Sequence, residues 1–151
     1  MNQRLDRLIQ LHQIKEDVTL ERYKQLEKAK EEFVQNKLRH DQLVGYRQDY
    51  LQQLENIGNE GSSVGRLRNR IDFINQLDKA LAQLNTHLAQ LAKTRAKAEV
   101  FYREAKASEE AVAKLIDRVK KNDQIKIQRL EQKESDEYAQ KQWYSKNIND
   151  Q

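Results

Sequence analysis

The sequence predicts an all-α protein, a long antiparallel two-helix coiled-coil hairpin with a C-terminal helical overhang. The chain contains no proline, and three of its four glycines lie within residues 58–65. Glycine adopts backbone angles that other residues avoid, so the chain can turn there. We therefore expect one helical hairpin over residues 1–151, with helices over about 3–57 and 66–146, a turn over 58–65 and a flexible tail to 151.

The composition indicates a narrow apolar seam between helices rather than a compact core. Apolar residues make up 37% of the 151 residues, charged residues make up 34%, and the mean hydropathy is −1.05. A compact core needs close to half of the residues to be apolar. Disorder is disfavoured because the net charge is only +4 and because Leu, Ala, Glu, Lys, Gln and Arg are strong helix formers.

The first predicted helix carries a heptad pattern in its second half. From Leu26 to Ile57, residues spaced alternately by three and four fill the a and d positions, and seven of these ten are apolar. Before Leu26 the apolar residues fit a period of 3.6 better than 3.5, which predicts a stutter and a less tightly wound N-terminal end. These residues are Leu5, Leu8, Leu11, Ile14 and Val18.

The second predicted helix keeps an apolar a/d seam from Leu67 to Leu91, interrupted by Arg70, and a weaker one from Arg95 to Val119. The best-packed part should therefore lie near the turn. If the helices pair across the turn, facing residue numbers add up to about 123. Residues from about 123 to 147 then have no partner helix, and they form either a docking surface or a frayed tail. Their apolar residues, with Ile148, are Ile125, Ile127, Leu130, Tyr138, Trp143 and Tyr144.

Charge is distributed unevenly along the chain. Residues 58–122 carry 13 basic and 8 acidic groups, whereas residues 1–57 carry 10 of each. Three of these basic residues near the paired ends, Arg118, Lys120 and Lys121, could steer the hairpin toward an acidic partner. We expect no nucleic-acid binding, because the basic residues alternate with acidic ones and no aromatic stacking platform lies among them.

Motifs of catalysis, cofactor binding and membrane insertion are not found in the sequence. There is no cysteine, and the glycine-rich segment lacks the Gly-Lys-Ser/Thr ending of a P-loop. His40 should lie near His87, but two histidines without a third ligand make a poor metal site. We expect no enzymatic activity, catalytic residue, cofactor or metal, and a cytoplasmic protein without a secretory signal or membrane span.

An aromatic group is predicted close to the turn. The pairing rule places Tyr50 beside Phe73, and Tyr46 beside Leu77. In this frame Tyr46 and Phe73 flank the seam, where a two-helix hairpin leaves side chains partly exposed. Exposed aromatic residues on a rigid scaffold are typical of binding hot spots, although they could also simply widen the hairpin core.

Three segments give the chain a resemblance to the flagellar export protein FliJ family. They are Tyr46-Arg47-Gln48-Asp49-Tyr50 before the turn, Phe73-Ile74-Asn75-Gln76-Leu77-Asp78-Lys79-Ala80-Leu81 after it, and Lys133-Glu134-Ser135-Asp136-Glu137-Tyr138-Ala139 near the C-terminus. Their order and spacing, together with the length and the asymmetric two-helix layout, carry the resemblance over nearly the whole chain.

The resemblance implies a component of the flagellar type III export apparatus at the cytoplasmic face of the cell membrane. It implies three partners: the hexameric flagellum-specific export ATPase, the membrane-embedded export gate protein and the flagellar export chaperones. The gate would contact the tip patch, which we define as Leu43, Tyr46, Tyr50, Phe73, Leu77, Ala80 and Leu84. The ATPase ring would contact the ring-facing set, defined as Leu5, Leu8, Leu11, Ile14, Val18, Arg118, Lys120, Lys121, Leu130, Tyr138 and Trp143.

Two alternatives share the predicted architecture. The equivalent stalk of a virulence type III secretion system has the same size and layout, and the tip motifs favour the flagellar version. A general coiled-coil holdase or adaptor would use apolar helix ends to hold unfolded clients, and broad client binding without an effect on an ATPase would identify it.

Overall fold

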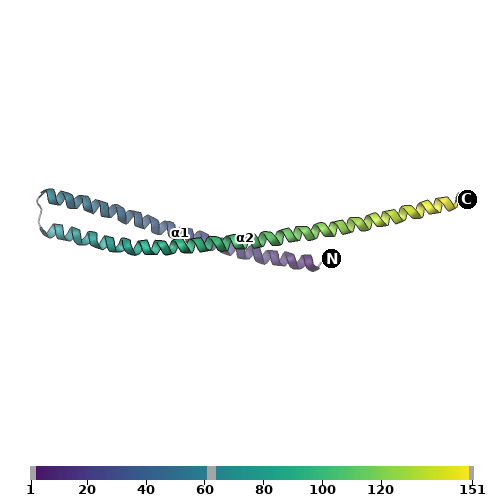
Figure 1. Cartoon of the computed structure of the whole chain (residues 1–151), viewed down its shortest axis with the longest axis horizontal. Helices are drawn as coiled ribbons and strands as arrows, with labels where there is room; N and C mark the ends of the chain where they lie inside the picture. Colours follow the sequence, from purple (N-terminus) through teal and green to yellow (C-terminus); the bar gives the residue numbers. More distant parts are fainter. Residues whose placement is uncertain (1–2, 61–63, 150–151) are drawn as a thin grey trace. The chain divides into compact units, whose positions relative to one another are not determined.

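The computed structural model describes residues 3–60 and 64–149, and all of them are helical. Helix α1 spans Gln3–Glu60 and helix α2 spans Val64–Asn149. The two helices run antiparallel and pack against each other, which confirms the predicted all-α coiled-coil hairpin (Figure 1).

The helices extend further into the glycine-rich segment than the predicted turn allowed. Gly58 lies inside α1 and Gly65 inside α2, and the part of the predicted turn at residues 61–63 is outside the described residues. A single glycine in a helix costs only about 1 kcal/mol relative to alanine, and no proline is present to stop either helix. The predicted turn was therefore too long, because its length was inferred from the glycine content alone.

The chain divides into two units, each containing part of both helices. The terminal unit comprises Met1–Val18 and Ala105–Gln151, and the tip unit comprises Thr19–Glu104. In Figure 1 the tip unit is coloured from blue through teal to green.

Side-chain contacts fix the register of the tip unit. The rings of Tyr50 and Phe73 have centroids 4.5 Å apart. The Nε atom of Arg47 donates to Oδ1 of Asp78 at 2.5 Å. The two pairs of residue numbers add up to 123 and 125, so the predicted pairing of Tyr50 with Phe73 is confirmed.

The predicted stutter before Leu26 is wrong. Half-buried or buried residues follow the three-four spacing of the seam without a break, and they are Leu5, Leu8, His12, Lys15, Thr19 and Arg22. By contrast, Leu11, Ile14 and Val18 are exposed by 39%, 58% and 43%. Facing α2, the helix keeps a 3.5-residue period even where polar residues fill the seam, and this turns several apolar residues outward.

The prediction that packing is best next to the turn is also wrong. Leu54, Ile57 and Leu67 are only half-buried, because they lie at the end of the described part of the hairpin, where fewer described residues surround them. The buried apolar residues of the tip unit lie further from the turn and comprise Leu26, Ala29, Ile74, Leu77, Leu88 and Leu91. The terminal unit has its own buried apolar residues, Val112, Ile116 and Val119, at 7–9% exposure.

Arginines at seam positions are accommodated by stacking on aromatic rings. A guanidinium can cover a ring face while its charged end stays in water, which avoids burying the charge. Three such pairs link the two helices in the tip unit: Arg22 over Phe101 at 4.8 Å, Arg70 over Tyr50 at 5.1 Å, and Arg95 over Phe33 at 5.7 Å.

Candidate interaction surfaces

The tip patch combines seam residues with exposed aromatic rings. Leu77 is buried at 7% exposure, whereas Tyr46 is 55% exposed and Phe73 is 40% exposed. Leu43, Tyr50, Ala80 and Leu84 are half-buried. The patch therefore rests on the seam and presents two rings to solvent beside it, as the heptad frame predicted.

Polar contacts hold the helices together around the tip patch. The Arg47–Asp78 ion pair joins α1 to α2 between partly exposed side chains. Arg70 lies over the ring of Tyr50 and also donates to the side chain of Gln53. These contacts connect α1 and α2 beside the exposed rings of Tyr46 and Phe73.

The ring-facing set lies entirely in the terminal unit and has two kinds of environment. Leu5 and Leu8 are half-buried in the seam, whereas Leu11, Ile14 and Val18 face solvent. The basic residues Arg118, Lys120 and Lys121 are all exposed. The set thus offers an apolar stripe on α1 and a basic cluster on α2.

Within residues 3–60 and 64–149, no helix covers the C-terminal part of α2. Every residue from 124 to 148 is exposed, and this segment continues past the N-terminal end of α1 (Figure 1). Leu130, Tyr138 and Trp143, the three members of the ring-facing set in this segment, are 61%, 65% and 64% exposed. Local bonds run along the helix, such as the Gln142 amide donating to the Tyr138 hydroxyl at 2.9 Å. The segment therefore presents its apolar side chains to solvent.

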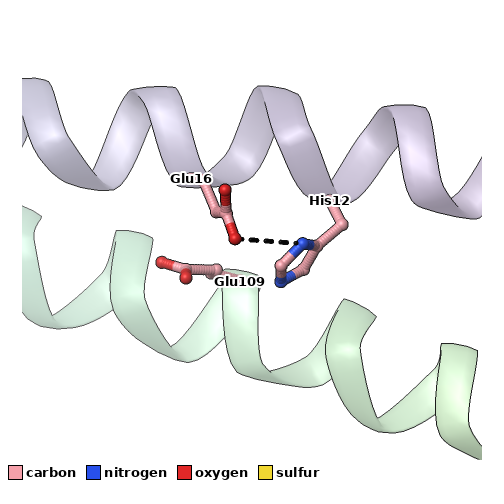
Figure 2. A group of neighbouring side chains, drawn as sticks. All are labelled: His12, Glu16 and Glu109. Carbon is pink, nitrogen blue, oxygen red and sulfur yellow. Dashed lines mark ion pairs between the residues drawn. The ribbon is translucent and has the colours of Figure 1, made fainter.

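One polar cluster in the terminal unit was missed by the sequence reasoning. His12 and Glu16 extend from α1 toward Glu109 on the facing part of α2 (Figure 2). His12 Nδ1 lies 3.4 Å from a carboxylate oxygen of Glu16, and one potential ligand atom from each of the three residues lies within 4.8 Å of the others. The signal was present, since His12 and Glu16 are one helical turn apart and the pairing rule places residue 111 opposite His12.

The surroundings of His40 are also polar. His40 is half-buried and its Nδ1 lies 3.1 Å from Oδ1 of Asp41 on the same helix, while His87 is exposed. Hydrogen bonds from His40 and then from Lys37 lower the pKa of the Asp41 carboxyl below its ordinary value. His40 therefore has a carboxylate neighbour on its own helix.

The comparison with protein families identifies the chain. The model of the flagellar FliJ protein family matches residues 1–147, which is nearly the whole sequence. The chain belongs to the FliJ family. The searches of curated proteins and of solved structures found no match.

Membership of the FliJ family connects the chain with flagellar protein export. This confirms the family resemblance carried by the segments around Tyr46, Phe73 and Tyr138. Charged residues interrupt the apolar stretches of both described helices, and neither helix contains a segment that could span a membrane.

Proposed function

We propose that this member of the FliJ family is the non-catalytic coiled-coil stalk of the flagellar type III export ATPase. The terminal unit binds the hexameric ATPase ring, promotes its assembly and raises its activity. The tip patch binds the membrane-embedded export gate, and the protein also contacts export chaperones at the cytoplasmic face of the cell membrane. The observation that carries the proposal is the family match over residues 1–147.

The exposed end of α2 supports ring binding by the terminal unit. Residues 124–148 present Leu130, Tyr138 and Trp143 to solvent without a covering helix. Large exposed apolar side chains concentrated on one element mark protein interaction sites. A single stalk in a sixfold ring contacts the subunits unequally, which is how it can impose cooperativity on them.

The exposed rings of the tip patch support the proposal that this patch is a second, separate binding site. Tyr46 and Phe73 are exposed beside a seam in which Leu77 is buried and the ring of Tyr50 contacts that of Phe73. The Arg47–Asp78 ion pair joins the two helices next to them. Rigid aromatic side chains of this kind contribute strongly to interfaces because they lose little conformational entropy on binding.

Two reciprocal alanine variants test both assignments with the full chain. Trp143→Ala should abolish the rise in ATP hydrolysis that one chain per several ATPase subunits produces, and it should leave binding to the export gate unchanged. Tyr46→Ala should weaken gate binding by about tenfold or more, the range of a hot spot, and leave ATPase stimulation intact. Each variant is the control for the other, since both replace exposed aromatic residues.

The proposed function fails if the wild-type chain leaves a ring-forming ATPase unaffected at every ratio. If Trp143→Ala still stimulated the ATPase fully, the assignment of the exposed C-terminal part of α2 to ring binding would be wrong. Broad binding of unfolded clients combined with no effect on the ATPase would instead identify the chain as a holdase.

Charge should influence the rate of ring binding. Arg118, Lys120 and Lys121 form an exposed basic cluster that can attract acidic loops of the ring. Raising the salt concentration should then slow association, because ions screen this attraction beyond about 10 Å at 0.1 M. An association rate that does not respond to salt would contradict this steering.

A further inference from the structure

We propose that His12, Glu16 and Glu109 form a binding site for a divalent transition-metal ion, with Zn²⁺ as its best fit, that clips α1 to α2 in the terminal unit. The proposal rests on the position, the chemistry and the spacing of these three side chains, and it does not depend on the proposed stalk function.

The position of the cluster is unusual for ionisable groups. His12 and Glu109 belong to the facing seams of α1 and α2, and their side chains are 26% and 14% exposed. Burying a carboxylate is costly unless a cation or several donors compensate its charge. The Nζ atom of Lys106 lies 3.9 Å from Oε1 of Glu109 on the same helix, and the Lys106 side chain is 46% exposed, so this lysine compensates the charge of Glu109 only in part. A metal ion between the helices would compensate the charge more directly.

The chemistry of the donors selects the class of metal. One imidazole nitrogen and two carboxylates match the ligands of Zn²⁺, which binds three protein ligands and one water in open sites. Imidazole also favours Zn²⁺ over Mg²⁺. Ca²⁺ requires six to eight oxygen ligands, more than two carboxylates supply.

The spacing of the donors fits this ion. Around a tetrahedral Zn²⁺ with bonds of about 2.0–2.1 Å, neighbouring ligand atoms are separated by roughly 3.3–3.5 Å. His12 Nδ1 and Glu16 Oε1 are already 3.4 Å apart. One ligand atom from each of the three residues, the imidazole atom being Nδ1 or Nε2, lies within 4.8 Å of the other two. Closing such separations requires shifts of about 1 Å or slightly more, which rotation of the flexible Glu16 and Glu109 side chains can provide. Figure 2 shows that the third ligand comes from the second helix, so binding would link the two.

The test is a Zn²⁺ titration of the full chain after removal of metal with a chelator, followed by competition with a chromophoric zinc indicator. Wild-type protein should bind one Zn²⁺ per chain. His12→Gln and Glu109→Gln, which preserve side-chain size, should each weaken binding by at least about tenfold, the lower limit seen even for loss of groups that only support ligands. His40→Gln is the matched control, because His40 is also a half-buried seam histidine beside a carboxylate.

Hydrogen exchange provides the second measurement. Zn²⁺ should slow amide exchange in residues 5–16 and 105–116 of the wild type and of His40→Gln, and not of Glu109→Gln. Absence of stoichiometric binding, or equal weakening by His40→Gln, would overturn the site. If Glu109→Gln bound Zn²⁺ with unchanged affinity, Glu109 would not be a ligand. The ion would then be bound by α1 alone and would not link the two helices. Far-UV circular dichroism confirms that each variant remains helical.

Discussion

Leu77 and Tyr46 belong to the same tip patch, yet their replacement by alanine should affect stability very differently. The pairing rule places them opposite each other, but Leu77 is 7% exposed and Tyr46 is 55% exposed. Leu77→Ala removes three carbon atoms at about 0.8 kcal/mol each, nearly all from a buried position, so we expect a loss of about 2 kcal/mol in the free energy of unfolding.

Tyr46→Ala should cost much less. Somewhat less than half of its surface is covered, so the lost burial amounts to about 1 kcal/mol of the 1.5–3 kcal/mol for a fully buried large side chain. Alanine also has the higher helix propensity, which returns about 0.5 kcal/mol. The expected net loss is about 0.5 kcal/mol, or a quarter of the effect of Leu77→Ala.

Urea unfolding followed by circular dichroism measures both values, provided that the dependence of the unfolding free energy on urea is unchanged. Similar losses of about 2 kcal/mol for both variants would refute the reasoning, because Tyr46 would then be a core residue. A small loss for Tyr46→Ala combined with weakened gate binding would separate the binding surface from the seam that supports it.

Three further predictions follow from the burial and charge of single residues. Val112→Ala should lower the unfolding free energy by about 1 kcal/mol, whereas the matched Val100→Ala should be nearly neutral in the same urea assay, because Val112 is 9% exposed and Val100 is 49% exposed. Trp143→Ala should leave the thermal midpoint within about 1 °C of wild type, because the ring is 64% exposed and contributes little to folding. Asp41→Asn should reduce the thermal midpoint slightly at neutral pH. Hydrogen bonds, first from His40, lower the folded-state pKa of Asp41 below 3.8, so the stabilisation by its ionised form is complete above that pH and is lost as the pH falls below it. The difference between wild type and Asp41→Asn should therefore shrink in melts below pH 3.8.

The fold and register were largely predictable from sequence because they depend on patterns that persist over many turns of helix. The three-four spacing after Leu26 and the glycine-rich segment were sufficient to place Tyr50 beside Phe73, and the structure confirms this contact. The predicted exposure of Tyr46 and Phe73 beside the seam also agrees with the structure.

The N-terminal half of α1 was predicted less well because its seam is polar. The stutter was inferred from Leu11, Ile14 and Val18, which are exposed rather than paired with α2. Packing near the turn was overestimated for a related reason. Leucines such as Leu54 and Leu67 indicate a seam, but the number of neighbouring layers determines their burial, and an end layer has fewer neighbours.

The polar seam also explains why the cluster around His12 escaped the sequence reasoning. Packing against the facing helix imposes a repeat of 3.5 residues on the buried positions. The pattern of apolar residues in the sequence reveals this repeat only where the buried positions are apolar. Glu109 already belongs to the seam predicted for the second helix, and His12 becomes a facing seam residue once the period is extended through the polar positions of the first, with Glu16 one turn away. Ionisable residues at facing seam positions weaken a coiled coil unless something compensates for them, and a metal ion would do so. The same extension leaves Leu11, Ile14 and Val18 on the outer surface, where they contribute little to the hairpin and remain available to a partner.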